Sequence, residues 1–201
     1  MAKNWEGSKA ECLALGDTGV IVVQRDGTCW FSSGIPRQLG NWIKGRQKHL
    51  PPVDLVAIGP SSVCFVQFCD GKSKCCGPDL LSEALRRRES SRVELLAFAS
   101  DEGWYVLWED GCSEWYNLPR GLHNVLNGRQ KSLPPVEELS IGPNDEWFVR
   151  FLDGKWKTGN LSEEVSVTLE TCRRRWDIMS ISFGQDPYIG GYAIRYNEHY
   201  T

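Results

Sequence analysis

The sequence lacks any run of about eighteen apolar residues, the length that a helix needs to cross a bilayer. Its first eleven residues are polar and lack the apolar segment of a signal peptide. These two absences predict a cytoplasmic protein that does not insert into membranes, with secretion by a non-standard route left open.

The motifs of common enzymes and metal sites are absent as well. The sequence has no P-loop, no Gly-x-Ser-x-Gly and no paired-histidine metal motif. Its histidines are His49, His123 and His199, and none lies in a motif. We therefore predict no enzyme, no catalytic residue and no cofactor, with a hydrolase or transferase as the alternative.

The charge and the cysteines exclude further classes. A net charge of −3 gives no general attraction to nucleic acid, so we do not expect that partner. Eight cysteines are shared unevenly along the chain, which favours free thiols over a repeated disulfide pattern. Cys64, Cys69, Cys75 and Cys76 lie close together but form no Cys-x-x-Cys pair, so we predict no metal site.

The chain contains a repeat. Residues Gly45–Val53 match Gly128–Val136 at an offset of 83 residues, and Asp-Gly pairs begin at positions 26, 70, 110 and 153. An apolar run of the β type precedes each pair, as Val20–Arg25, Cys64–Cys69, Trp104–Glu109 and Trp147–Leu152. Self-similarity at about forty residues is typical of solenoids and propellers.

Each unit is predicted to contain three strands and a short helix. A shorter apolar stretch precedes each β-type run, and together the two indicate a hairpin. Asp-Gly supplies a tight turn into a third strand, which carries Trp30, Trp115 and Trp156 in three of the units. An amphipathic stretch with proline near its start follows, which predicts a helix.

A fifth unit is split between the two termini. Ile178–Gly184 and Gly191–Tyr196 resemble the first two strands, and Asn4–Ser8 resembles the third-strand segment Lys155–Gly159. We therefore predict a mainly β fold: a closed five-bladed β-propeller in a single domain, with the last blade closed by the N-terminal strand. A two-lobed fold is the alternative, and the predicted units are 11–52, 53–92, 93–135, 136–176, and 177–201 plus 1–10.

The motif from Trp147 to Trp156, with Gly128–Val136 upstream, resembles a tryptophan-rich repeat of uncharacterised eukaryotic proteins. That repeat is sometimes appended to other domains, and the resemblance covers the whole chain without implying an activity. In ring size and aromatic content the chain also resembles tachylectin-type five-bladed lectins. This second resemblance is architectural, because no sugar-binding motif matches residue by residue.

Three binding hypotheses follow. The first is a lectin-like, multivalent protein that stacks glycans on repeated indoles, with Trp5, Trp30, Trp115 and Trp156 as candidates. The second is an intracellular scaffold for protein partners. The third is anion binding by a basic rim with candidates Arg46, Arg129 and Arg174. The structural alternatives are that the tryptophans fill gaps between blades and that the arginines complement helix dipoles. The ligand and the oligomeric state stay open.

Overall fold

The computed structural model of the 201-residue chain describes residues 10–16, 19–24, 28–46, 51–129, 134–186 and 191–198. Every structural statement below refers to these ranges. No helix within them is both long and apolar enough to cross a membrane.

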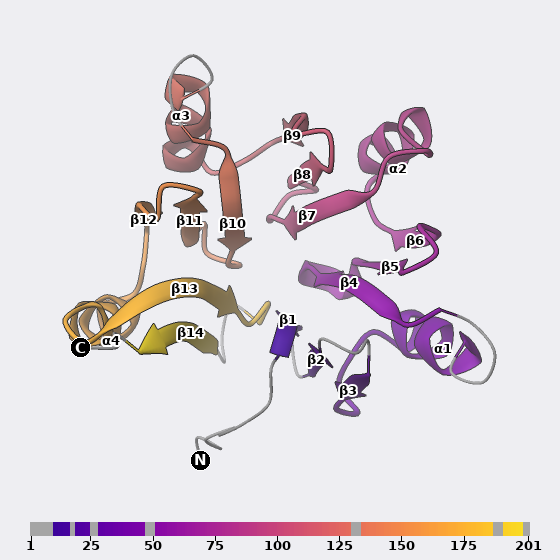
Figure 1. The fold of residues 1–201 in the computed structure, drawn as a ribbon, viewed down its shortest axis with the longest axis horizontal. Coiled ribbons are helices and arrows are strands. Elements are labelled where there is room, and N and C mark those ends of the chain that lie inside the picture. The colour runs from indigo at the N-terminus through magenta and orange to yellow at the C-terminus, as the bar shows by residue number, and fades with distance from the viewer. Residues whose placement is uncertain are drawn as a thin grey trace.

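The described chain forms five antiparallel sheets arranged radially around one axis (Figure 1). Sheet 1 contains β1 (Ala10–Leu15), β2 (Val20–Gln24) and β3 (Cys29–Phe31). Sheet 2 contains β4 (Val53–Ile58), β5 (Cys64–Phe68) and β6 (Ser73–Cys76). Sheet 3 contains β7 (Val93–Phe98), β8 (Trp104–Trp108) and β9 (Ser113–Tyr116), and sheet 4 contains β10 (Val136–Ile141), β11 (Trp147–Phe151) and β12 (Trp156–Gly159). Sheet 5 has two described strands, β13 (Trp176–Phe183) and β14 (Tyr192–Glu198).

One helix follows the third strand of each of the first four sheets and lies at the outside of the ring (Figure 1). These helices are α1 (Arg37–Arg46), α2 (Asp79–Arg87), α3 (Arg120–Arg129) and α4 (Glu163–Arg173). The prediction of a mainly β fold with repeated three-stranded sheets and short helices is confirmed. A single 3-10 turn at Pro60–Ser62 joins β4 to β5.

The Asp-Gly pairs form the turns between second and third strands, as predicted. Gly71, Gly111 and Gly154 have φ angles of +80°, +78° and +78°, the left-handed region that glycine tolerates best. The aspartate before each glycine accepts a hydrogen bond from the backbone N–H two residues later, at 2.9–3.1 Å. These carboxylates therefore serve turn geometry. The first pair, at 26, lies outside the described residues.

The helix in each unit is a consequence of having three strands. Trp104 pairs with both Phe98 and Tyr116, so the third strand ends beside the end of the inner strand. The next inner strand begins at the opposite end, about 17 Å away for a five-residue strand. A helix of about ten residues rises about 15 Å and so returns the chain across that distance.

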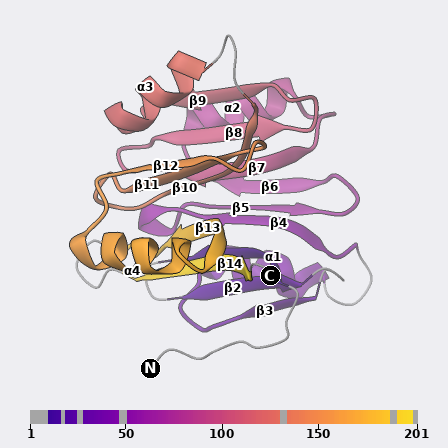
Figure 2. The same cartoon turned by 60° about the vertical axis from the view of Figure 1, so that its left-hand side comes forward.

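Apolar packing joins each sheet to the next. We call the space between two consecutive sheets a seam, so that the 1/2 seam lies between sheets 1 and 2. A cluster of buried residues occupies each of the 1/2, 2/3, 3/4 and 4/5 seams. The helix of the earlier unit covers the outside of each seam (Figure 2) and contributes a buried pair: Leu39 and Ile43, Leu81 and Ala84, Leu122 and Leu126, Val165 and Leu169.

The innermost strands contact one another around the ring. β1 contacts β4, β4 contacts β7, β7 contacts β10, β10 contacts β13, and β13 contacts β1. At the last of these contacts the Ser182 hydroxyl donates to the Leu13 carbonyl at 3.1 Å, and the Gln185 N–H donates to the Gly16 carbonyl at 3.4 Å. Polar groups, rather than a buried apolar cluster, thus join the first and last described sheets.

Candidate functional site

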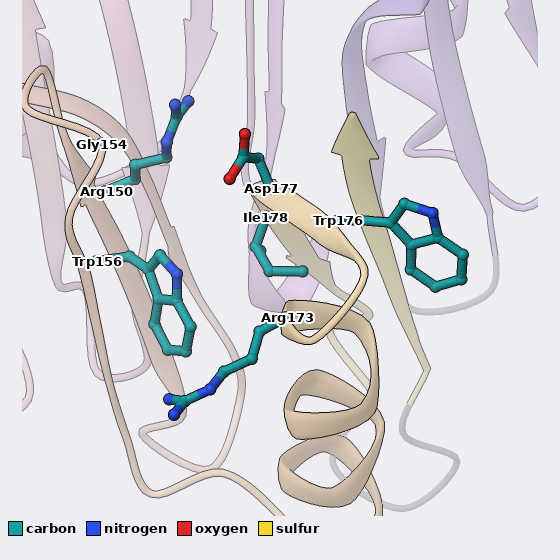
Figure 3. A pocket seen from close by; sticks show the side chains of 7 residues that line it. All are labelled: Arg150, Gly154, Trp156, Arg173, Trp176, Asp177 and Ile178. Carbon is teal, nitrogen blue, oxygen red and sulfur yellow. The ribbon is translucent and has the colours of Figure 1, made fainter. Parts of the chain in front are cut away.

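A hollow of about 460 Å³ opens at the 4/5 seam (Figure 3). It lies between the β11–β12 hairpin, the end of α4 and the first residues of β13. The residues that give it chemical character are Arg150, Trp156, Arg173, Trp176 and Asp177, with Ile178 at its base.

The early start of β13 brings these residues together. Ile178 pairs with Tyr196 as Val136 pairs with Phe151, so Ile178 is the counterpart of the first residue of β10. β13 nevertheless begins two residues earlier, at Trp176. Only residues 174 and 175 separate it from α4, which leaves Arg173 beside the start of the strand.

Aromatic rings form part of the wall. Trp156 is half-buried and tilted against Phe148, with ring centroids 6.0 Å apart. Figure 3 shows its indole facing the hollow near Arg173. Trp176 points away from Trp156 and stacks on Tyr196 at 4.4 Å. One indole face, that of Trp156, is therefore placed to meet a ligand.

Charged groups of both signs line the hollow. Arg150 and Asp177 both line the hollow (Figure 3), and the Nη1 of Arg150 lies 3.1 Å from a carboxylate oxygen of Glu137. The Arg150 side chain is 14% exposed, and its Nε is buried without a hydrogen-bond partner. Arg173 is exposed, with Nε 3.1 Å from Glu170. The site thus offers donors and acceptors with little net charge.

The sequence-predicted tryptophans occupy unlike positions. Trp30 is opposite Val22, Trp115 is opposite Tyr105, and Trp156 is opposite Arg150. The second strand of each of the first four sheets has a valine at its centre, and the third-strand residues opposite it are Trp30, Lys74, Glu114 and Lys157. Trp30, Trp115 and Trp156 therefore occupy three different register positions. The prediction of repeated, equivalent aromatic sites is wrong.

Their surroundings differ as well. Trp30 is 46% exposed, whereas Trp115 is half-buried and stacks on Tyr105 with centroids 6.2 Å apart. Because adjacent strand residues face opposite sides, Trp30 and Trp115 lie on opposite faces of their sheets. Trp5 lies outside the described residues. Of the predicted tryptophans that the structure describes, Trp156 is the one that lines the hollow.

The arginine candidates do not gather into one site. Arg46 and Arg129 are the last residues of α1 and α3, and their side chains lie outside what the structure describes. Arg174 is the exposed residue that follows α4. It lies next to Arg173 in sequence but is not among the residues that line the hollow.

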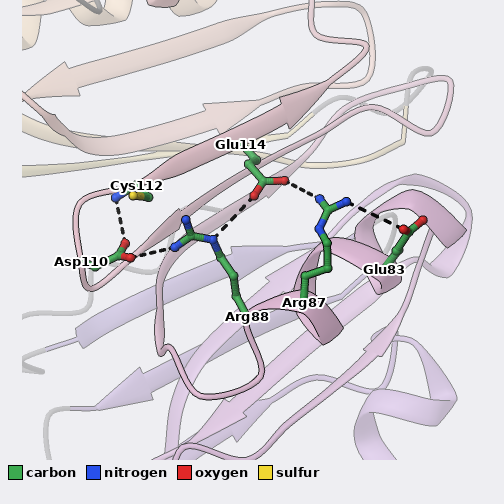
Figure 4. Close-up of polar contacts among 6 residues, drawn as sticks. All are labelled: Glu83, Arg87, Arg88, Asp110, Cys112 and Glu114. Carbon is green, nitrogen blue, oxygen red and sulfur yellow. Dashed lines mark hydrogen bonds and ion pairs between the residues drawn. The ribbon is translucent and has the colours of Figure 1, made fainter.

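Basic residues after α2 are engaged in ion pairs (Figure 4). Arg87 contacts Glu83 and Glu114 at 3.8 and 2.8 Å, and Arg88 contacts Asp110 at 2.7 Å. Arg88 also lies 4.6 Å from the centre of the Trp108 ring. The backbone N–H of Cys112 and the Arg88 guanidinium lower the pKa of Asp110. These arginines tie α2 to the β8–β9 hairpin, a role that neither the anion-binding hypothesis nor the helix-dipole alternative predicted.

Four of the charged and aromatic residues that line the hollow were not chosen as site candidates from the sequence: Arg150, Arg173, Trp176 and Asp177. The sequence did mark Arg150 as unusual, because it is a charged residue inside the apolar run Trp147–Phe151. Leu107 and Gln67 hold the same register position in sheets 3 and 2. Gln67 there exchanges two hydrogen bonds with the backbone of Val93 at 2.9 Å each.

The described thiols are free, and several are shielded. Burial raises the pKa of Cys12 and Cys29 to about 11 and that of Cys64 and Cys75 to about 12. Such thiols stay protonated at neutral pH and react slowly. Among the residues with described placement, no group of His, Cys, Asp and Glu could hold a metal ion.

No known protein family matches the chain, and no curated protein matches its sequence. A solved structure similar in fold is that of Prp20p from Saccharomyces cerevisiae, described together with its binding properties to Gsp1p and histones. The two chains are 15% identical with a TM-score of 0.45, and the match covers 98% of this chain. This chain spans 58% of the length of Prp20p. A likeness at this level assigns no partner.

Glu138 is a titrating group on the strand next to the hollow. Glu138 lies in β10, where it is half-buried and pairs with Arg150 of β11. Its carboxylate Oε2 lies 3.4 Å from Nη2 of Arg195. Burial raises its pKa to about 7, an effect that Glu137 reinforces and that the positive charges of Arg195 and Arg150 oppose. Its ionisation therefore falls in the physiological range.

We predict that Glu138 makes the fold less stable as the pH rises. Because the folded state holds this proton more tightly than the unfolded chain, its contribution is fully present below pH 4.5 and is lost as the pH passes 7. Its loss lowers the free energy of unfolding by about 3 kcal/mol. Urea unfolding at pH 5 and pH 8 gives the difference in the free energy of unfolding between the two pH values, and we expect this difference to be smaller in Glu138→Gln than in the native protein. An equal difference in both proteins contradicts the prediction.

We predict that Trp115 stabilises the fold and that Trp30 contributes little. Trp115→Ala removes a half-buried indole stacked on Tyr105 and lowers the free energy of unfolding by about 3 kcal/mol. Trp30→Ala, at an exposed position, lowers it by less than about 1 kcal/mol. Urea unfolding measures both free energies, and equal losses in the two variants would contradict this prediction.

Proposed function

We propose that the chain is a non-catalytic binding protein built as a closed five-bladed β-propeller. The ring of contacts among β1, β4, β7, β10 and β13 supports closure. A propeller serves binding well because loops and side chains at several seams surround one rigid body.

Closure of the last blade by the strand around Trp5 stays a prediction, and the described units set a condition on it. Trp115 stands 21 residues before Val136 and Trp156 stands 22 before Ile178, but Trp5 stands five residues before Ala10. Five residues span at most about 18 Å. The connection to the next inner strand is therefore much shorter here than in the other described units.

We propose further that the hollow beside Trp156 is the ligand site and that its ligand is a saccharide unit. The observation that carries this is an indole face that lines the same hollow as a guanidinium and a carboxylate. A sugar ring has an apolar face that stacks on indole, and its hydroxyls both donate and accept hydrogen bonds. Arg150 would donate to them and Asp177 would accept from them.

The balance of charge favours a neutral ligand over phosphate or sulfate. Glu137 and Glu170 lie beside the two arginines of the hollow, so little positive charge is left for an anion. A volume of about 460 Å³ lies in the usual range of about 300–1,000 Å³ for small-ligand sites. The proposal is therefore lectin-like binding at one site, in place of the several equivalent sites predicted from the sequence.

A protein partner is the second candidate, favoured by a different observation. On the face of sheet 1 that points away from sheet 2, Leu13, Leu15, Val20 and Val22 are only half-buried and form an apolar surface.

We predict that a glycan array detects binding and that the hollow accounts for it. Trp156→Ala removes the stacking face and Asp177→Asn removes the carboxylate, so each weakens binding by at least about tenfold. Asp177 is exposed, so its variant keeps the native melting temperature. Trp30→Ala is the matched control, because it removes an indole that does not line the hollow.

Intrinsic fluorescence provides the second readout. A bound sugar that quenches the native protein should leave Trp156→Ala unchanged. Silence across the array, or an equal loss of binding in Trp30→Ala, would contradict the saccharide site.

A further inference from the structure

Two stacked aromatic rings border the hollow. Trp176 is one of the residues that line the hollow, and its indole points away from Trp156 (Figure 3). It stacks on Tyr196, with ring centroids 4.4 Å apart and an angle of 22° between the ring planes. Trp176 is half-buried and Tyr196 is 43% exposed. We call these two residues the aromatic pair. The hollow therefore continues into a second aromatic surface that is accessible to solvent.

The aromatic pair forms because the ladder of sheet 5 is longer than those of its neighbours at this end. In sheets 2, 3 and 4, pairing of the first two strands begins at the counterparts of Ile178, which are Val53, Val93 and Val136. Sheet 5 has two more pairs before Ile178, and these contain Trp176 and Asp177. The residues two places before the three valines are Pro51, Ser91 and Pro134. An indole at this place is thus a departure from the repeat.

Tyr196 holds a register position that is buried in other sheets. It is opposite Ile178, and the residues opposite the counterparts of Ile178 are also aromatic: Phe68, Trp108 and Phe151. Each of these three is at most 1% exposed and belongs to the apolar cluster of the seam before its sheet. Among the described residues, the cluster of the 4/5 seam does not include Tyr196. Its ring packs on Trp176 instead and keeps apolar area at the surface.

The aromatic pair has the chemistry of a sugar-binding surface. A sugar unit presents an apolar face that stacks on an aromatic ring, and the Tyr196 hydroxyl is able to donate to a sugar hydroxyl and to accept from one. Because Trp176 points away from Trp156 (Figure 3), a single sugar unit cannot stack on both indoles. Two successive units of one chain can.

We propose that the aromatic pair is a second subsite and that the ligand is a linear oligosaccharide of neutral sugars; this rests on the saccharide site proposed above. One unit occupies the hollow against Trp156, and the next unit stacks on the aromatic pair. Once the first unit is bound, the second is held close to its subsite, so its contacts add to the affinity with little further loss of translational freedom. Affinity therefore rises with chain length.

Chain length provides the test. The probes are three series of neutral sugars: glucose, cellobiose and cellotriose; glucose, maltose and maltotriose; and N-acetylglucosamine, chitobiose and chitotriose. NMR titration of the native protein measures the affinity for each sugar. In a series that binds, we expect the trisaccharide to bind at least about tenfold more tightly than the monosaccharide.

The outcomes separate this proposal from the saccharide site itself. Equal affinity for the monosaccharide and the trisaccharide overturns the second subsite and leaves the site beside Trp156 intact. Silence in all three series also overturns the second subsite, whereas the glycan array decides whether the hollow binds any saccharide.

Variants locate the gain in affinity with chain length. Tyr196→Ala removes one ring of the aromatic pair at an exposed position, and we expect the trisaccharide to lose its advantage over the monosaccharide. Tyr116→Ala is the matched control, because Tyr116 is 47% exposed, lies in sheet 3 and does not line the hollow. This control should keep the whole gain. Trp156→Ala removes the ring that the first unit needs and should weaken binding of every sugar in a series.

Two further variants separate stacking from stability. Tyr196→Phe keeps the ring and should keep most of the gain. Trp176→Leu removes the other ring but retains apolar volume, so it serves as the second test if Tyr196→Ala does not fold. The melting temperature of each variant shows whether it is folded. A gain that persists in folded Tyr196→Ala or folded Trp176→Leu overturns the second subsite.

Discussion

The packing of one sheet face against the next is the interaction on which this structure depends. A three-stranded sheet with apolar residues on both faces is marginal alone and needs a neighbour on each side. Val66, Val106 and Val149, at the centres of their sheets, are completely buried because such neighbours are present. The same requirement explains why consecutive sheets pack face to face. Any seam with weaker apolar packing becomes the point where the structure opens or where another chain can be added.

The helices follow from the same constraint. After three strands the chain lies at the end opposite to the one where the next inner strand begins. A helix returns it across that distance and covers the outside of the seam that it crosses. Variation in this return changes the surface. Where α4 passes into β13 through only two residues, Trp176 and Asp177 come to lie beside Trp156 and Arg173, and a hollow results. The candidate site is thus a local departure from the repeat.

Spacing and alternation in the sequence were sufficient to predict the repeated three-stranded sheets, the described Asp-Gly turns and the short helices. Whether the indoles are equivalent could not be predicted without knowing the register of the third strand against the second. Trp30, Trp115 and Trp156 stand four, five and three residues after the aspartate of their turns, and a shift of one residue reverses the face. The hollow could not be predicted either, because its residues come from β11, β12, α4 and β13 and meet only in the folded ring.

Native-state hydrogen exchange tests most directly the claim that the 5/1 seam is the weak point of the ring. Sheets sealed on both sides should exchange only through global unfolding, so the amides of β5, β8 and β11 should share the highest free energy of exchange. Amides of β14 and β2 should exchange through openings of clearly lower free energy. Protection of β14 equal to that of β8 would show that all five seams are alike and would contradict this account.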